Sequence, residues 1–330
     1  MVNTYAAGND VCSFILRRIG KEVMSVAVFT GNDHKGKTQK ERIQEITEQL
    51  EAGVIAVFES DAYKAYLKCM SKFHNYSLNN TLLIALQRPD ASLVAGYNAW
   101  KKDHGRQVRK GEKGIKIIAP CKYKVELDEK DEDGNQKVAE YTGFKVATVF
   151  DYSQTEGREL PSIGVNELTG DVSGFKKLFN ALTEISPVPI YTEDIHGGAK
   201  GYYSDADRKI VIKSDMSQLQ TIKTMIHELA HEKLHAKEHL DKEHPSDRRT
   251  KEVEAESIAY TICQHYGLDS SDYSFSYVAG WSSGKDTKEL KASLERIRSA
   301  ADEMITDIDK SLERQTKREQ QRASRSEARW

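Results

Sequence analysis

The stretch from His227 to His231, His-Glu-Leu-Ala-His, constrains this chain more than any other part of its sequence. Two histidines four residues apart on a helix point to the same side, so both imidazoles can reach one metal ion. Glu228 lies between them, where its carboxylate can take a proton from a water molecule beside the metal. The segment therefore predicts a helix that carries a zinc (Zn2+) site of the kind that hydrolyses peptide bonds.

Such a site needs a third protein ligand, and the next predicted helix, Glu252–Tyr266, offers carboxylates for it. Glu252 and Glu256 are four residues apart on one face of that helix, whereas Glu254 points elsewhere. We predict that Glu252 binds the metal and that Glu256 supports it by accepting a hydrogen bond from a ligating imidazole. Exchange of these roles among Glu252, Glu254 and Glu256 is the alternative.

Further histidines follow the motif, but helix geometry argues against them as ligands. His235 would lie about 12 Å from His227 along the helix axis, too far to share an ion whose bonds to nitrogen are about 2.1 Å long. We therefore predict that His235 packs beside the site or supports a ligand. His239 and His244 are expected at the surface.

The surrounding segments predict the second half of the chain. A helix over Phe175–Leu182 precedes two short strands at 202–204 and 209–212, and the second strand is expected to be an edge that holds an extended peptide. The metal-binding helix is predicted over Gln218–His235, and a long helix over Lys285–Leu312 has apolar residues at alternating spacings of four and three. Candidates for stabilising an oxyanion are Tyr202, Tyr203 and Tyr260.

The first half of the chain carries a concentrated positive charge. The whole chain has a formal net charge of -2, yet Asp61–Lys124 contains 13 Lys and Arg against 4 Asp and Glu. Aromatic and amide side chains alternate with these cations, as suits single-stranded nucleic acid. The alternative is that Phe73, Tyr97 and Trp100 are core residues and the lysines a solvated face. The predicted DNA-binding set is Phe73, Tyr76, Asn79, Asn80, Tyr97, Trp100, Lys101, Lys102, Arg106, Arg109, Lys110, Lys113 and Lys116.

Local patterns in this first half predict helices and strands together. Apolar periodicity and Pro89 indicate helices over the ranges 39–50, 62–70, 79–86 and 97–103, followed by a loop at 105–114. Strands are expected at 115–119, 123–127 and 144–150, with a turn at Asp133-Gly134-Asn135. The fold class expected for the whole chain is therefore α+β.

A second motif lies near the N-terminus. Gly31–Thr38 matches the phosphate-binding loop pattern with Lys37 as its cation, which would indicate nucleotide binding. The segments that follow lack the strand–helix alternation that such a loop requires, so a polar loop before a helix is the favoured interpretation. Met24 is a candidate for the true start, which would make residues 1–23 non-native.

Cysteine usage and hydropathy indicate the compartment. The four cysteines, at positions 12, 69, 121 and 263, form no closely spaced pair, which fits a reducing cytoplasm better than a disulfide framework. No apolar run is long enough to span a membrane. A cytoplasmic protein without a membrane partner is expected.

Several sequence blocks resemble a known family. The runs FHNYSLNNTLLIALQRP, VAGYNAWKKDHGRQVRKGEKGIKIIAP and VFDYSQTEGRELP are similar to the N-terminal domain of ArdC-like antirestriction proteins. The runs GYYSDADRKIVIKSD, HELAHEKLH and EVEAESIAY resemble the zincin-like peptidase domain that accompanies it, also found in ImmA/IrrE-type proteases. The resemblance covers roughly residues 40–310 and leaves residues 1–38, including the phosphate-binding loop pattern at Gly31–Thr38, outside it.

The resemblance implies an α+β domain that binds single-stranded DNA, followed by a zincin-like metallopeptidase domain with a long C-terminal helix. It also implies carriage on a mobile genetic element and protection of entering DNA from restriction. Candidate partners besides single-stranded DNA are restriction-modification proteins or another protein substrate. Glu252 falls on the position of the family's third metal ligand. The expected boundaries are an N-terminal extension at 1–38, the DNA-binding domain at 39–155, a linker at 156–174, the peptidase domain at 175–312 and a charged, disordered tail at 313–330.

Overall fold

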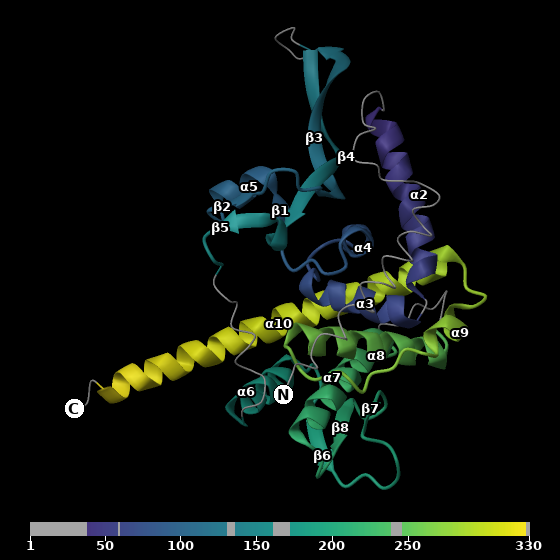
Figure 1. The fold of residues 1–330 in the computed structure, drawn as a ribbon. Helices are drawn as coiled ribbons and strands as arrows, with labels where there is room; N and C mark the ends of the chain where they lie inside the picture. The colour runs from purple at the N-terminus through teal and green to yellow at the C-terminus, as the bar shows by residue number, and fades with distance from the viewer. Residues whose placement is uncertain (1–37, 59, 131–135, 161–171, 239–245, 328–330) are drawn as a thin grey trace, which may run out of the picture. The chain divides into compact units, whose positions relative to one another are not determined.

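The computed structural model describes residues 38–58, 60–130, 136–160, 172–238 and 246–327 (Figure 1). These residues form two compact units, and the division is not a single cut in the chain. The first unit comprises the described parts of Met1–Val57 and Tyr76–Leu160, and the second comprises those of Phe58–Asn75 and Pro161–Trp330. Both units mix helices and strands, so the expected α+β class is confirmed.

A long β-hairpin dominates the first unit (Figure 1). Its strands β3 (Ile115–Lys130) and β4 (Gln136–Asp151) pair antiparallel, where the sequence had predicted three shorter strands. The short strand β1 (Val94–Gly96) pairs with the end of β4, which gives the sheet order β1-β4-β3. The expected turn at 133–135 lies outside the described residues.

Helix α4 (Leu78–Gln87) follows the free edge of β3 and hydrogen bonds to its backbone. The side-chain amide of Asn80 donates to the carbonyl of Ile118 and accepts from its N–H, both at 2.9 Å. Gln87 makes the same pair of bonds to Lys116, both at 2.8 Å. Two residues seven positions apart on one helix therefore satisfy the outward backbone groups of two alternate strand residues.

The remaining elements of the first unit are short apart from α2 (Gln39–Val57). Thr38 and Glu41 begin α2 with a capping box, since each side chain hydrogen bonds to the other's backbone N–H. Strand β2 (Arg106–Val108) occupies part of the predicted loop at 105–114 and pairs with β5 (Thr155–Gly157), which lies beyond the expected strands. The other two elements are α5 (Tyr97–Lys102) and the 3-10 helix η1 (Tyr152–Gln154).

The sheet of the second unit corrects one expectation. Its order is β6-β8-β7, with β6 (Ile190–Glu193) parallel to β8 (Lys209–Lys213) and β7 (Gly201–Ser204) antiparallel to it. The β7–β8 hairpin was predicted, but β6 was not. Strand β8 is therefore the middle strand and cannot take the extended peptide that was assigned to it. Its run Ile-Val-Ile is wholly buried, as a central strand requires.

Five long helices pack in the described part of the second unit. Helix α7 (Gln218–His235), which has the predicted bounds, contacts β7 and β8, and α8 (Arg248–His265) packs against α7. Helix α10 (Thr287–Glu327) contacts α6 (Val172–Ile185), α7 and α8, while α3 (Ser60–Lys72) packs on α8. The shared core contains Leu178, Leu182, Ile212, Met225, Ile226, Ile258, Ile262, Leu294, Ile297 and Ile305.

Capping residues explain why two of these helices begin where they do. Helix α8 begins at Arg248, four residues before the predicted start at Glu252. Asp247 caps it by accepting a hydrogen bond from Thr250 N–H at 2.7 Å. Asp286 and Glu289 form a capping box at the start of α10. This helix continues to Glu327, so most of the segment expected as a disordered tail from residue 313 is helical.

The position of α3 differs from the expected domain boundary, which placed residues 39–155 in one domain. Three of the lysines in the basic segment, Lys64, Lys68 and Lys72, belong to this helix and hence to the second unit. The other cations of the basic segment, from Arg88 onward, belong to the first unit. None of the described helices has an apolar stretch long enough to cross a bilayer.

Candidate metal centre and nucleic-acid interface

Helix α7 presents two different faces. Ile222, Met225, Ile226 and Leu229 are buried among the core residues, and this apolar side fixes the rotation of the helix against the sheet. His227 and His231 consequently lie on the side that lines a cavity of about 610 Å³. Ser217 caps the helix by accepting from Gln220 N–H at 3.2 Å.

The structure brings together the three predicted metal ligands. The Nε2 atoms of His227 and His231 are 3.1 Å apart, and Oε2 of Glu252 on α8 lies 3.6 Å from each of them. Among the described residues this is the only group of three or more His, Cys, Asp or Glu found within reach of one ion. Glu252 therefore lies where the spacing argument placed it, ahead of the alternatives Glu254 and Glu256.

The spacing of these donors fits a metal ion. A tetrahedral site with bonds of about 2.1 Å separates its donors by about 3.4 Å, and the three observed separations lie on either side of that value. Two imidazoles and one carboxylate also form a common donor set of catalytic zinc sites that leave a position open. The residues present are therefore suited to a divalent ion.

Electrostatics within the triangle favour a charged carboxylate. The imidazoles of His227 and His231, each 3.6 Å from its carboxylate, hold the pKa of Glu252 far below its usual value. Burial acts to lower the pKa of His227, but Glu252 and Glu228 outweigh it and raise that pKa. For His231 burial prevails and the pKa is lowered. The site thus combines a negative charge with two closely spaced imidazoles, which is an environment that attracts a cation.

Glu228 has the position expected of a proton acceptor. It is 7% exposed and borders both the larger cavity and a second one of about 450 Å³, which also shares Gly201 and His227. Burial raises the pKa of Glu228 to about 7; the charge of Glu252 adds to the rise and His227 opposes it. A carboxylate poised near neutral pH can both take and return a proton.

Strand β7 forms the wall beside Glu228, and its close approach depends on Gly201. A Cβ atom at this position would lie 2.7 Å from Cγ2 of Thr224 and 3.0 Å from the backbone oxygen of Val211. Both contacts are closer than packed atoms allow, so glycine lets the strand lie directly against α7. Strands β6 and β7 are the two outer strands of the described sheet, and β7 is the one whose residues line the larger cavity.

The three tyrosines proposed for an oxyanion differ in position. Tyr202 and Tyr203 on β7 line the larger cavity. Tyr203 OH donates to Asp205 at 3.2 Å and also lies 3.2 Å from a guanidinium nitrogen of Arg208. Tyr260 is 2% exposed and packs among aromatic rings of the core, so it is not available to a substrate.

The supporting residues differ from the prediction in one respect. Glu256 accepts a hydrogen bond from Tyr277 OH at 2.5 Å instead of one from a ligating imidazole. His235 does contact a predicted ligand, since its Nδ1 lies 3.0 Å from Nδ1 of His231, and its Nε2 lies 3.1 Å from Oε2 of Glu254. Glu254, which was expected to point elsewhere, is completely buried beside these histidines. His239 and His244 lie outside the described residues.

The phosphate-loop motif contributes no described site. Gly31–Lys37 and Met24 lie outside the described residues. Thr38, the last residue of the motif, caps α2 with its hydroxyl group. This role agrees with the favoured interpretation of the segment as a loop before a helix.

In the first unit, some residues of the predicted DNA-binding set serve the interior. Trp100 is fully buried and donates its indole N–H to the carbonyl of Phe150 at 2.8 Å, so neither face is free to stack on a base. The amide of Asn80 is occupied by β3, and Tyr76 OH donates to the carbonyl of Val94 at 3.3 Å. Phe73 is buried in the second unit.

Three of the predicted cations also have structural partners. Arg106 is buried, donates to Thr155 and Gly157, and lies 4.2 Å from the ring centre of Tyr152. Arg109 pairs with Glu112 at 2.6 Å, and Lys116 donates to Thr148 Oγ1 at 2.7 Å. The exposed members of the set are Asn79, Tyr97, Lys101, Lys102, Arg109, Lys110 and Lys113.

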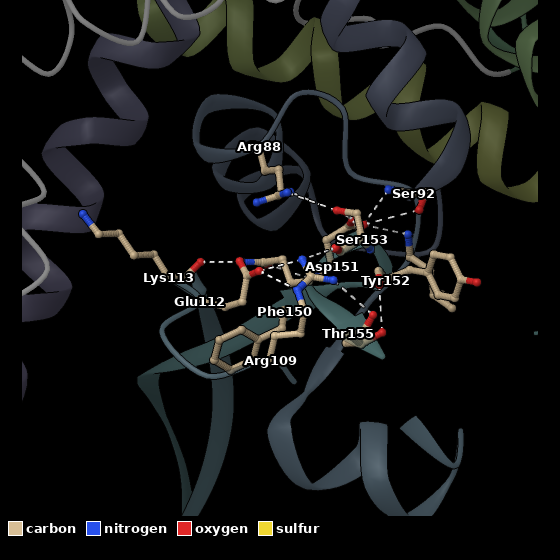
Figure 2. A network of polar contacts seen from close by, with 12 residues as sticks. Arg88, Ser92, Arg109, Glu112, Lys113, Phe150, Asp151, Tyr152, Ser153 and Thr155 are labelled. Carbon is tan, nitrogen blue, oxygen red and sulfur yellow. Dashed lines mark hydrogen bonds and ion pairs between the residues drawn. The ribbon is translucent and has the colours of Figure 1, made fainter. Parts of the chain in front are cut away.

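A buried carboxylate organises the surroundings of the loop that carries Lys110 and Lys113 (Figure 2). Asp151 accepts hydrogen bonds from the backbone N–H groups of Ser92 at 2.7 Å and Ser153 at 2.8 Å. Its own N–H donates to Gln154, whose amide nitrogen donates to the carbonyl of Lys113 at 2.8 Å. The exposed lysines therefore project from a loop that the network holds in place.

We predict that Asp151→Asn lowers the free energy of unfolding of the first unit by about 2 kcal/mol at pH 7, because buried backbone donors lose a charged acceptor. Burial acts to raise the pKa of Asp151, but hydrogen bonds from Ser153, Ser92 and Leu93 outweigh it and lower that pKa. Its stabilisation is therefore present above about pH 4 and is lost as the pH falls through the folded-state pKa. The β4 amides should exchange their hydrogens faster in Asp151→Asn than in the wild type at pH 7, and this difference should become smaller in acid. Equal exchange in both proteins at pH 7 would contradict the assignment.

The hairpin carries further exposed aromatic residues that the sequence analysis missed. Tyr123 and Tyr141 are paired across the strands with ring centres 5.9 Å apart, and both are about half exposed, at 50% and 46%. Phe144 is 62% exposed. The available signal was the alternation of these rings with lysines in the sequence, at Lys122, Lys124 and Lys145. Alternating rings and cations suit stacked bases and their phosphates.

Two known domain families match this chain, one in each half of the sequence. Residues 36–150 match the N-terminal domain of anti-restriction factor ArdC, and residues 184–266 match the IrrE N-terminal-like domain of the M78 peptidases. The chain carries an ArdC-type domain and an IrrE-type domain. The IrrE-type match contains His227, Glu228, His231 and Glu252, and it ends before α10 begins.

One curated protein is similar to this chain over most of its length. An uncharacterized protein of Bacillus anthracis is 31% identical over 336 residues, which cover 89% of this chain and 56% of the relative. The chain thus spans about half the length of the curated relative it matches.

Two crystal structures of the antirestriction ArdC protein from plasmid R388 are also similar to this chain. The metal-free structure is 25% identical with a TM-score of 0.42 and covers 72% of this chain and 84% of that one. The Mn(II)-bound structure is 20% identical with a TM-score of 0.45 and covers 82% and 97%.

Proposed function

We propose that this protein is an antirestriction factor of a mobile genetic element. In this proposal the ArdC-type domain binds single-stranded DNA and the IrrE-type domain is a zinc-dependent peptidase. The observation that carries the peptidase assignment is the triangle of His227, His231 and Glu252 beside the buried Glu228. A cytoplasmic location and a restriction-modification protein as substrate belong to the same proposal.

The residues of the cleft have separate tasks in hydrolysis. A divalent ion held by the triangle would act as a Lewis acid towards a water molecule and the scissile carbonyl. Strand β7 would hold the substrate backbone in an extended form, with its carbonyl near Tyr202 or Tyr203. Glu228 would take a proton from the attacking water and return it to the leaving amine.

The direct test is proteolysis of restriction subunits by the wild-type protein and by Glu228→Gln, each with and without single-stranded DNA. Specific cleavage by the wild type alone supports the proposal, and stimulation by DNA would link the two domains. Absence of cleavage by a metal-loaded wild type, while antirestriction persists, favours the alternative of a non-catalytic DNA-binding protein with a structural zinc site. The weaker alternative, a nucleotide-dependent factor, requires ATP or GTP binding that is lost in Lys37→Ala.

Support for DNA binding comes from the exposed surface of the first unit. Lys101, Lys102, Lys110 and Lys113 are exposed cations, and Tyr97 is 53% exposed near the start of the same segment. The β3–β4 hairpin adds the exposed rings of Tyr123, Tyr141 and Phe144 and their neighbouring lysines. Binding through phosphates and stacked bases would be tolerant of the DNA sequence.

We predict that replacing both Lys110 and Lys113 by alanine weakens binding to a short single-stranded oligonucleotide by about tenfold at low salt. Each lysine is exposed on the loop held by Gln154, so its loss removes a phosphate contact without removing a buried partner. Fluorescence anisotropy across a salt series should also show a shallower salt dependence for the double variant. Lys288 and Lys291, exposed or half-exposed on α10, provide a matched double-alanine control. Equal affinities of the test variant and the wild type would exclude the loop from the interface.

A further inference from the structure

Glu254 ends a chain of side-chain contacts that begins at a proposed metal ligand. Nδ1 of His231 lies 3.0 Å from Nδ1 of His235, and Nε2 of His235 lies 3.1 Å from Oε2 of Glu254. The side chain of His235 is 5% exposed and that of Glu254 is 0% exposed, so water does not compete for these contacts. The chain leads from the cleft into the interior of the second unit.

Helix α10 anchors the buried end of this chain. Oε1 of Glu254 accepts a hydrogen bond from Ser293 Oγ at 2.7 Å and two from the Arg296 guanidinium, at 3.0 Å from Nε and 2.6 Å from Nη2. A buried carboxylate is costly unless its charge is paired and its oxygens accept hydrogen bonds. Here one oxygen is satisfied by α10, which leaves the other for His235.

These contacts determine where the protons lie. The anionic Glu254 requires a donor at Nε2 of His235, so in a neutral His235 ring Nδ1 is an acceptor. The facing Nδ1 of His231 must then carry the donated hydrogen, which leaves Nε2 of His231 unprotonated. That atom is the one that faces His227 and Glu252.

We propose that Glu254 and His235 are positioning residues that hold His231 in the one tautomer and ring orientation able to bind the metal. This inference rests on the proposed metal site and adds α10 to it, through Ser293 and Arg296, which lie outside the segment that matches the IrrE-type family. The two ligating histidines are then unequal. Among the described residues, no hydrogen bond reaches Nδ1 of His227, whose side chain is 27% exposed against 15% for His231.

The test measures metal affinity and the His231 tautomer separately in the full chain. His235→Phe keeps the volume of a ring but removes the acceptor, and Glu254→Gln removes the charge. Each should lower zinc affinity by about 10–100-fold in competition with a chromophoric chelator. Asp309→Asn is the matched control, because Asp309 of α10 accepts a hydrogen bond from Tyr266 of α8 at 2.8 Å and does not contact these histidines. Its zinc affinity should equal that of the wild type.

Long-range ¹H–¹⁵N correlation spectra of the metal-free proteins give the second readout. We expect His231 to be protonated at Nδ1 in the wild type and in Asp309→Asn, and to become a mixture of tautomers in His235→Phe. Unchanged affinity in both test variants, an equal loss in the control, or a mixed tautomer in the wild type would overturn the inference. If the wild type binds no metal, the proposed function fails, and the spectra alone decide whether the positioning chain exists.

Discussion

Replacing Glu228 by glutamine is expected to slow peptide hydrolysis by about 10²–10⁴-fold, the usual contribution of a general base. The amide has nearly the same shape as the carboxylate but cannot accept the proton of the attacking water. Glu228 is buried at the border of both cavities and is not a member of the donor triangle. Metal content and fold should therefore remain those of the wild type.

The measurement compares initial cleavage rates with metal content determined on the same samples. Glu232→Gln is the matched control, because Glu232 is also buried on α7 but borders neither of the two cavities described. Its cleavage rate should remain within a few-fold of the wild type. A Glu228→Gln protein that cleaves at the wild-type rate would show that another group takes the proton, or that the observed hydrolysis belongs to a contaminant.

The second large effect is expected for His227→Ala, which should abolish stoichiometric metal binding. Two donors remain, and a catalytic zinc site needs three from the protein. The loss should exceed the roughly 10–100-fold caused by changes to residues that only support a ligand. Because an ion bound only to the folded state adds about 2.7 kcal/mol of stability at a hundred times its Kd, the variant should also lose the rise in melting temperature that zinc gives the wild type.

Metal analysis after dialysis, together with melting curves before and after chelator treatment, tests this expectation. His196→Ala is a suitable control because His196 is exposed in the same unit and does not belong to the triangle. It should bind metal at the wild-type level. A wild type that binds neither zinc nor manganese, with melting unaffected by chelator, would contradict both the site and the enzyme assignment.

Local sequence signals were sufficient for the centre of the candidate site. The bounds of α7 followed from helix periodicity. Periodicity also placed Glu252 and Glu256 on one face of the next helix, and the family resemblance favoured Glu252 of the two. Glu254 was missed for the same reason: the periodicity of α8 turns it away from Glu252. Its role depends on α10, some 40 residues further along the chain, and no local pattern reports that contact.

Errors elsewhere arose where tertiary contacts outweigh local composition. Trp100 and Arg106 belong to a sequence rich in aromatic residues and cations, which indicates a DNA surface, yet both are buried. Strand β6 is only four residues long and was missed, so β8 was taken for an edge strand. The continuous Ile-Val-Ile run of β8 is typical of a strand covered on both sides and was the signal that could have corrected this expectation. Helix α3 likewise belongs to the second unit because it packs on α8, which is far from it in the sequence, and local composition does not predict that contact.

The bonds that Asn80 and Gln87 make to β3 have a consequence for how the protein behaves in a crowded cell. An open strand edge is a template on which another chain can build sheet. Helix α4 occupies that place at Lys116 and Ile118, and the next outward-facing residue, Pro120, has no N–H to offer. A strand of another molecule therefore cannot pair with this part of β3, where the apolar residues Ile115 and Ile117 would otherwise favour aggregation.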